Sequence, residues 1–158
     1  MKKQNLITID KWCVRFIIKV LVVGSSGLVG SAVTRVLQNS PKVSKLINST
    51  RESTDLFSLE ETKKLIEINT PDVIVMSAAK VGGIMANNTF RSEFILQNLK
   101  NNMNIFESCI GHKDIKIINL GSSCIYPLNA SNPINEDSFM TGPLEPTNSP
   151  YAMAKIAG

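Results

Sequence analysis

Short apolar runs alternate along this chain with longer segments in which apolar residues recur every three or four positions. A short apolar run is typical of a buried strand, and the longer repeat is typical of one face of a helix. The predicted strands are residues 19–23, 45–50, 73–76 and 115–120. The predicted helices are residues 28–37, 58–68 and 92–109. This alternation predicts an α/β fold with a Rossmann-type doubly wound parallel sheet.

Two of these helices carry more specific signals. Ser58 and Glu61 have the spacing of a capping box at the start of the second helix. On the third helix, apolar residues at helical spacing predict a stripe that faces the core. The members of this stripe are Phe94, Ile95, Leu99, Met103, Phe106 and Ile110.

Three glycines follow the first strand at three-residue spacing, where the first helix begins. Gly24 permits a sharp turn, Gly27 lets the backbone approach a pyrophosphate, and Gly30 allows the helix to pack closely on the strand. The start of the helix also offers free N–H groups to an anion. The pattern is a variant of the dinucleotide-binding fingerprint, and its alternative is an ordinary strand-to-helix turn. The predicted contacts are Gly24, Ser25, Ser26, Gly27, Leu28, Val29 and Gly30.

The end of the second strand bears on the choice of coenzyme. An NAD-selective site has an acidic residue there that holds the ribose hydroxyls. This chain has Arg51 instead, and no acid occurs before Glu52. A guanidinium pairs well with a 2′-phosphate, so Arg51 favours NADP over NAD. The alternative is a solvated surface arginine.

Candidate reactive groups gather in the last third of the sequence. Ser122 follows the fourth strand directly, which places it at the carboxyl edge of the sheet, where ligands bind in such folds. After a proline-rich loop, Tyr151 and Lys155 stand four residues apart and share one helix face. An ammonium near a phenol lowers the pKa of the phenol, so Tyr151 can pass a proton near neutral pH while Ser122 polarises a carbonyl.

Composition narrows the functional classes. The net charge of +4 is mild and forms no dense basic patch, so no nucleic-acid partner is expected. No apolar run approaches the length of a membrane span, so no membrane partner is expected either. The three cysteines, Cys13, Cys109 and Cys124, are odd in number and lack metal-ligand spacing, which favours reduced thiols in the cytoplasm and no metal site. Residues 1–17 form an extension of unknown use, and residues 18–158 form the NADP-binding domain.

Four motifs in this order make the chain resemble the extended short-chain dehydrogenase/reductases. They are the glycine turn 24–30, the segment 78–88 (AAKVGGIMANN), the segment 120–127 (LGSSCIYP) and the segment 144–158 (LEPTNSPYAMAKIAG). The last three motifs are typical of the branch that epimerises and reduces GDP-4-keto-6-deoxy-D-mannose. The resemblance runs from about Ile18 to the end of the chain.

The resemblance implies roles for individual residues. Tyr151 is expected to protonate the oxygen at C4 of the sugar during hydride transfer, Lys155 to hold the nicotinamide ribose, and Ser122 to hydrogen-bond the substrate. Cys124 is expected to be an acid/base group for epimerisation at C3 and C5, and its alternative is a small buried filler. NADP(H) supplies the hydride. The implied coenzyme contacts beyond the glycine turn are Arg51, Leu56, Ala78, Ala79, Leu120, Gly121, Ser122, Ser123, Tyr151 and Lys155.

Two features depart from the family pattern. Ser26 stands where many bacterial members have an arginine that helps to bind the phosphate. The chain also stops at Gly158, before the family's partner histidine, its last strands and its C-terminal substrate domain, so an incomplete domain is expected. A truncated, non-catalytic NADP-binding or dimerisation module is therefore the alternative, while the motifs argue against another sugar-nucleotide epimerase or dehydratase. The family pattern also implies a homodimer through the long helix and the tyrosine helix.

Overall fold

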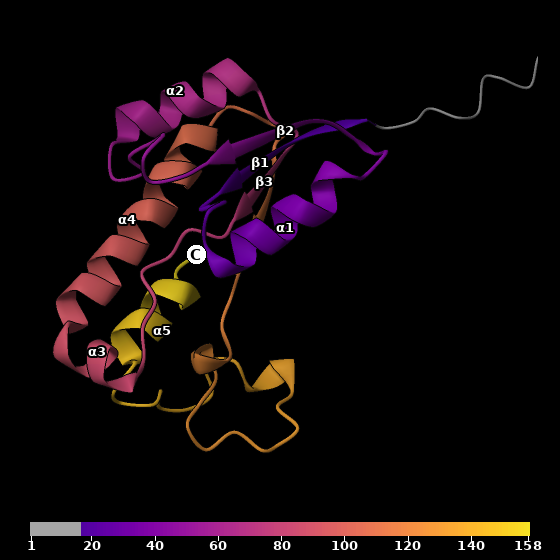
Figure 1. Ribbon diagram of the computed structural model, residues 1–158. Coiled ribbons are helices and arrows are strands. Elements are labelled where there is room, and N and C mark those ends of the chain that lie inside the picture. The colour runs from indigo at the N-terminus through magenta and orange to yellow at the C-terminus, as the bar shows by residue number, and fades with distance from the viewer. Residues whose placement is uncertain (1–16) are drawn as a thin grey trace, which may run out of the picture.

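The computed structural model describes residues 17–158, in which strands and helices alternate as predicted (Figure 1). The strands are β1 (Ile18–Val23), β2 (Val43–Ser49), β3 (Val73–Met76) and β4 (Lys116–Asn119). The α-helices are α1 (Leu28–Gln38), α2 (Leu59–Asn69), α3 (Ile84–Thr89), α4 (Arg91–Cys109) and α5 (Ser149–Ile156). Two 3₁₀ turns, η2 (Ser123–Ile125) and η3 (Glu136–Ser138), lie between β4 and α5. The predicted extension lies outside the described residues, apart from Ile17.

The four strands form one parallel sheet in the order β2-β1-β3-β4. The chain runs from β1 outward to β2 and then crosses back to β3 on the other side of β1. The direction of winding therefore changes between β1 and β3. In doubly wound sheets, ligands bind beyond the carboxyl ends of the strands at such a change. The predicted fold class is confirmed.

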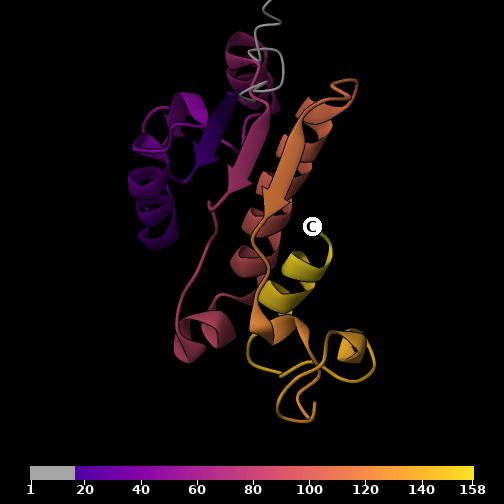
Figure 2. The ribbon, with the colours of Figure 1, turned by 90° about the vertical axis from the view of Figure 1, so that its right-hand side faces the viewer.

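Helices cover both faces of the sheet (Figure 2). One core cluster joins β1 and β3 to α2 and α4, and its buried members are Leu21, Val23, Ile66, Ile74, Met76 and Ile105. On the opposite face, Val20, Val22 and Val75 pack against Val33 and Leu37 of α1. Because both faces of the central strands are covered, their sequences are continuous apolar runs rather than alternating ones.

The buried face of α4 is more polar than its sequence predicts. Phe94 is buried, but Met103 is 62% exposed and Ile110 is 79% exposed, so the predicted apolar stripe is wrong at these two positions. The buried polar residues of the helix are Asn98, Asn102, Asn104 and Ser108. Each asparagine side chain hydrogen-bonds the backbone of another segment, which makes its burial tolerable.

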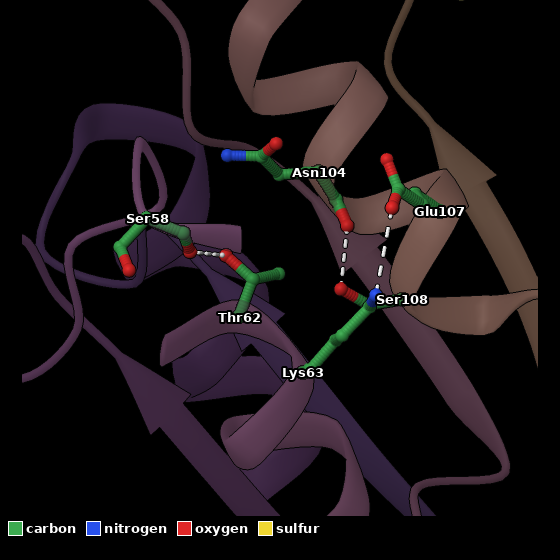
Figure 3. A network of polar contacts seen from close by, with 6 residues as sticks. All are labelled: Ser58, Thr62, Lys63, Asn104, Glu107 and Ser108. Carbon is green, nitrogen blue, oxygen red and sulfur yellow. Dashed lines mark hydrogen bonds and ion pairs between the residues drawn. The ribbon is translucent and has the colours of Figure 1, made fainter. Parts of the chain in front are cut away.

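An ion pair joins α2 to α4, and further polar contacts lie within each of these helices (Figure 3). The Ser58 hydroxyl accepts a hydrogen bond from the backbone N–H of Glu61 at 3.2 Å, so the first half of the predicted capping box is confirmed. Lys63 Nζ lies 3.4 Å from a carboxylate oxygen of Glu107. The Ser108 hydroxyl donates to the carbonyl of Asn104 at 2.6 Å. Of these three contacts, the one between Lys63 and Glu107 joins the two helices, whereas the other two are local to α2 and to α4.

The motifs that carry the family resemblance meet at one end of the molecule. The carboxyl ends of the strands, α5 and the loop 127–148 lie together there (Figures 1 and 2). Helix α5 packs along α4 and against η2. None of the helices within residues 17–158 is both long and apolar enough to cross a membrane.

Candidate active site

The glycine turn leaves no room for a side chain at two positions. Gly24 has a φ of +74°, and a Cβ there would lie 2.6 Å from the backbone nitrogen and Cα of Ala78. At Gly30, a Cβ would overlap the carbonyl of Gly24 and lie 2.8 Å from Ser77 Oγ. The end of β1, the start of α1 and the end of β3 therefore approach too closely for a side chain at either position, so the structural requirement for both glycines is confirmed.

The start of α1 is open to a ligand. Gly27 is the N-cap residue, and no side chain caps the helix. Leu28 is 91% exposed and Val29 is 49% exposed. The first N–H groups of the helix are therefore free to bind a phosphate, and the positive end of the helix dipole lies at the same place. Ser25 is buried, and its hydroxyl donates to the carbonyl of Ser49 at 3.1 Å, so its side chain fastens the turn to β2.

A cleft of about 350 Å³ opens beside this turn. The predicted coenzyme contacts that line it are Gly24, Ser26, Gly27, Arg51, Leu56, Ala78 and Ala79. The other lining residues are Glu52, Thr54, Asp55, Phe57, Ser77 and Asn101. Most of these belong to the connection between β2 and α2, which has no periodic pattern that would have revealed them. Asn101 lies within the polar part of α4, where nothing in its local sequence distinguishes it from its neighbours.

Arg51 and Glu52 place opposite charges side by side in the cleft. A hydrogen bond from the Thr50 side chain is the main cause that lowers the pKa of Glu52, and the charge of Arg51 contributes. Glu52 is therefore ionised at neutral pH. Asp55 uses its carboxylate to accept the backbone N–H of Phe57 at 2.9 Å. Arg51 thus supplies a cation at the carboxyl end of β2, where the sequence predicts a contact with a 2′-phosphate.

The four predicted catalytic side chains come together where the segment after β4 meets α5. The Cys124 thiol donates to Ser122 Oγ at 3.0 Å. Lys155 is only 9% exposed, and its Nζ donates to the carbonyl of Leu120 at 2.9 Å. The same Nζ lies 5.9 Å from the centre of the Tyr151 ring. Tyr151 and Lys155 therefore share one face of α5, as their spacing predicts.

Burial governs protonation in this cluster. It is the largest cause of the raised pKa of Tyr151; the negative charge that Cys124 carries when ionised adds to the effect, and hydrogen bonding to Ser122 opposes it. Burial also lowers the pKa of Lys155. The prediction that the pKa of Tyr151 is lowered is therefore wrong for this arrangement, because burial disfavours the charged phenolate. The phenol stays protonated, which is the form that a proton donor needs.

Contacts with α4 fix the position of α5. The rings of Phe94 and Tyr151 meet edge to face, with their centres 6.4 Å apart. The Arg91 guanidinium donates to the carbonyl of Pro146 at 2.7 Å and to the Ser149 hydroxyl at 3.0 Å. The first residue of α4 thereby holds the segment that leads into α5. Tyr151 is positioned both through its ring and through the start of its helix.

The remaining predicted coenzyme contacts lie outside the cleft lining. They are Ser25, Leu28, Val29, Gly30, Leu120, Gly121, Ser122, Ser123, Tyr151 and Lys155. Of these, Leu120 and Gly121 lie between β4 and η2, and Ser123 is the first residue of η2. Leu120 contributes the carbonyl that holds Lys155. No contact in the structure tests a role for these residues in coenzyme binding, which stays a prediction.

The model of the NAD dependent epimerase/dehydratase family matches residues 20–158. The chain belongs to this family. It is also similar to the GDP-L-fucose synthase of Sinorhizobium fredii, with 45% identity over 140 residues. That match covers 89% of this chain and 44% of the relative. The chain thus spans less than half the length of this relative.

Solved structures show the same fold. A GDP-L-fucose synthetase from Naegleria fowleri bound to NADP matches with a TM-score of 0.76 and 30% identity, covering 87% of this chain and 41% of the other. A GDP-mannoheptose C4 reductase from Campylobacter jejuni with NADP bound matches with a TM-score of 0.81 and 29% identity, covering 88% of this chain and 44% of the other. Both similarities support the Rossmann-type architecture of the family member described here.

Proposed function

We propose that this chain is the coenzyme-binding part of a GDP-L-fucose synthase that uses NADP(H). The proposal rests on one observation: Ser122, Cys124, Tyr151 and Lys155 cluster at the carboxyl edge of a sheet whose glycine turn opens onto a cleft. The similarity to a GDP-L-fucose synthase and to NADP-bound structures supports the assignment. In such an enzyme, GDP-4-keto-6-deoxy-D-mannose is epimerised at C3 and C5 and reduced at C4.

The residues of the cleft fit NADP(H). Because no side chain caps α1, its first N–H groups are available to the pyrophosphate. Arg51 lies in the cleft lining, where its guanidinium suits the 2′-phosphate. Ala78 and Ala79 line the cleft where the chain leaves β3, and their small side chains leave room for a ligand. When bound, the coenzyme supplies the hydride that reduces C4.

The chain's own residues would then handle protons and orientation. Tyr151 donates its phenolic proton to the oxygen at C4 as the carbonyl becomes an alcohol. The side chain of Ser122 hydrogen-bonds the Tyr151 phenol and orients the oxygen at C4. Lys155 is held by the Leu120 carbonyl, close to the ring of Tyr151. From there its ammonium holds the nicotinamide ribose. Cys124 takes or returns a proton at the epimerised carbons.

A chimaera that joins this chain to the remaining segment of the Sinorhizobium fredii relative tests the function. It is expected to convert GDP-4-keto-6-deoxy-D-mannose and NADPH to GDP-L-fucose.

In the same chimaera, Cys124→Ser should slow solvent-deuterium incorporation at C3 and C5 by about 100-fold, because a serine hydroxyl is too weak an acid for the exchange. Reduction of a substrate that is already epimerised should change little. Cys109→Ser, at the end of α4, is the matched control, and equal loss of both steps in Cys124→Ser contradicts the role.

Arg51 is expected to determine the preference for NADPH. Arg51→Ala removes a charge-assisted pair and should raise the Kd for NADPH by about 10- to 100-fold, while the Kd for NADH stays nearly unchanged. Fluorescence titration of the 158-residue chain measures both constants. Arg35→Ala, which removes a cation from the last turn of α1 outside the cleft lining, is the control for net charge. A wild-type preference for NADH contradicts the assignment.

We also propose a homodimer that forms through α4 and α5. Exposed apolar side chains lie on these two packed helices, and they include Leu96, Met103 and Met153. Sedimentation equilibrium of the chain measures this association.

A cytoplasmic location is proposed because Cys109 and Cys124 are unpaired thiols, which persist in a reducing compartment. Cell fractionation tests the location.

A further inference from the structure

We propose that Asn101 recognises the adenine base of the coenzyme through its side-chain amide, which makes it a specificity-determining residue of the cleft. This inference rests on the proposed binding of NADP(H). Asn101 lines the cleft, and its Oδ1 is buried without a hydrogen-bond partner. A buried amide oxygen without a partner is unusual, because most such groups are satisfied within the protein.

Two neighbouring asparagines on α4 show what a purely structural role requires. Asn98 Oδ1 accepts the backbone N–H of Lys80 at 2.9 Å, and its Nδ2 donates to the Lys80 carbonyl at 3.0 Å. Asn104 Nδ2 donates to the carbonyl of Leu56 at 2.7 Å. The first asparagine therefore holds the segment after β3, and the second holds the connection before α2, on the other side of the cleft.

Helix geometry places Asn101 between these two anchors. Residues three apart on an α-helix are turned by about 60° and displaced by about 4.5 Å along the axis. Asn98, Asn101 and Asn104 therefore form one row along α4. The outer two fasten the walls of the cleft, and the middle one lines the cleft between them. Figure 3 shows Asn104, whose backbone carbonyl accepts the hydrogen bond of the Ser108 hydroxyl.

The cleft corresponds to the adenosine half of the coenzyme. Arg51 lines it, whereas Ser122, Tyr151 and Lys155 do not. Leu56 and Phe57 add apolar surface, which suits the flat faces of a base. Phosphate oxygens only accept hydrogen bonds, so they cannot satisfy the Asn101 oxygen. The adenine amino group donates one, and the adjacent ring nitrogen accepts one.

The chemistry of an amide matches that edge of adenine. An asparagine side chain can accept from the amino group at position 6 and donate to N7 at the same time. Hypoxanthine has a carbonyl at position 6, so it offers an acceptor where Asn101 needs a donor. Recognition by Asn101 therefore predicts discrimination between these two bases.

Titration of the 158-residue chain with NADPH and with its hypoxanthine analogue tests the proposal. The wild-type chain is expected to bind NADPH about 10-fold more tightly than the analogue. In Asn101→Leu this ratio should fall to within about twofold, chiefly because NADPH binds more weakly. Asn88→Leu is the matched control, since Asn88 is exposed on α3 and outside the cleft lining.

Stability measurements keep the test independent of folding defects. Removing an unsatisfied buried oxygen relieves its desolvation penalty, so Asn101→Ala and Asn101→Leu should unfold at a urea concentration no lower than wild type. A base preference that persists in both variants overturns the proposal, as does a wild-type chain that binds both coenzymes equally. A wild-type chain that binds neither NADPH nor its analogue overturns the proposed function as well.

Discussion

Replacement of Tyr151 by phenylalanine is expected to lower the rate of C4 reduction by at least about 100-fold, the usual contribution of a positioned proton donor. The ring is retained, so its edge-to-face contact with Phe94 and the packing of α5 on α4 are preserved. Binding of NADPH should therefore change little. The rate is measured in the chimaera with the Sinorhizobium fredii segment, and the binding is measured in the 158-residue chain.

The raised pKa of Tyr151 adds a pH criterion to this prediction. Because the folded protein holds the phenol in its protonated form, reduction should not decline through ionisation of Tyr151 as the pH rises to about 9. Tyr126→Phe is the matched control, since it removes the other phenol, at the end of η2, without touching α5. Retention of full activity in Tyr151→Phe would exclude this residue as the proton donor.

Gly24→Ala is expected to destabilise the domain by about 3 kcal/mol or more. The left-handed φ of +74° costs an alanine about 1–2 kcal/mol. The new methyl group would also lie 2.6 Å from backbone atoms of Ala78, and overpacking of this kind typically costs about 1–3 kcal/mol. Backbone atoms cannot move aside as the tip of a flexible side chain can. The turn, the start of α1 and the end of β3 would all have to shift.

Urea unfolding of the 158-residue chain, followed by circular dichroism, measures the effect. Gly83→Ala is the control, because no atom lies within 4 Å of a Cβ at that position and its φ is −71°. The control should lose no more than about 1 kcal/mol, the usual cost of changing an N-cap glycine. A Gly24→Ala protein as stable as this control contradicts the assigned geometry of the turn.

Local patterns predicted most of the elements because their causes are local. Val73–Met76 is a continuous apolar run since both faces of β3 are covered, and the strand occurs where predicted. The Ser58 cap depends on a residue three positions away. Tyr151 and Lys155 share a face because four residues make about one helical turn. These three features depend only on residues that are a few positions apart in the sequence.

Relations between distant segments were not predictable in this way. Asn98 and Asn104 are buried because they hydrogen-bond Lys80 and Leu56, which precede them by 18 and 48 positions. A helical pattern assigns polar residues to the solvent and apolar residues to the core. It therefore placed Met103 and Ile110 in the core, although both side chains are exposed. The pKa of Tyr151 was likewise misjudged, because the spacing to Lys155 is visible in the sequence but the partial burial of the ring against Phe94 of α4 is not.

The sequence by itself determined the order of strands and helices, the glycine turn and the pairing of a phenol with an ammonium on one helix face. It did so because backbone geometry and side-chain burial impose short periods on the chain. Only the tertiary structure decided that α4 fastens both walls of the cleft and leaves the Asn101 oxygen unpaired between them. The physical reason is that hydration and hydrogen bonding of a buried group depend on segments that meet only when the sheet is assembled.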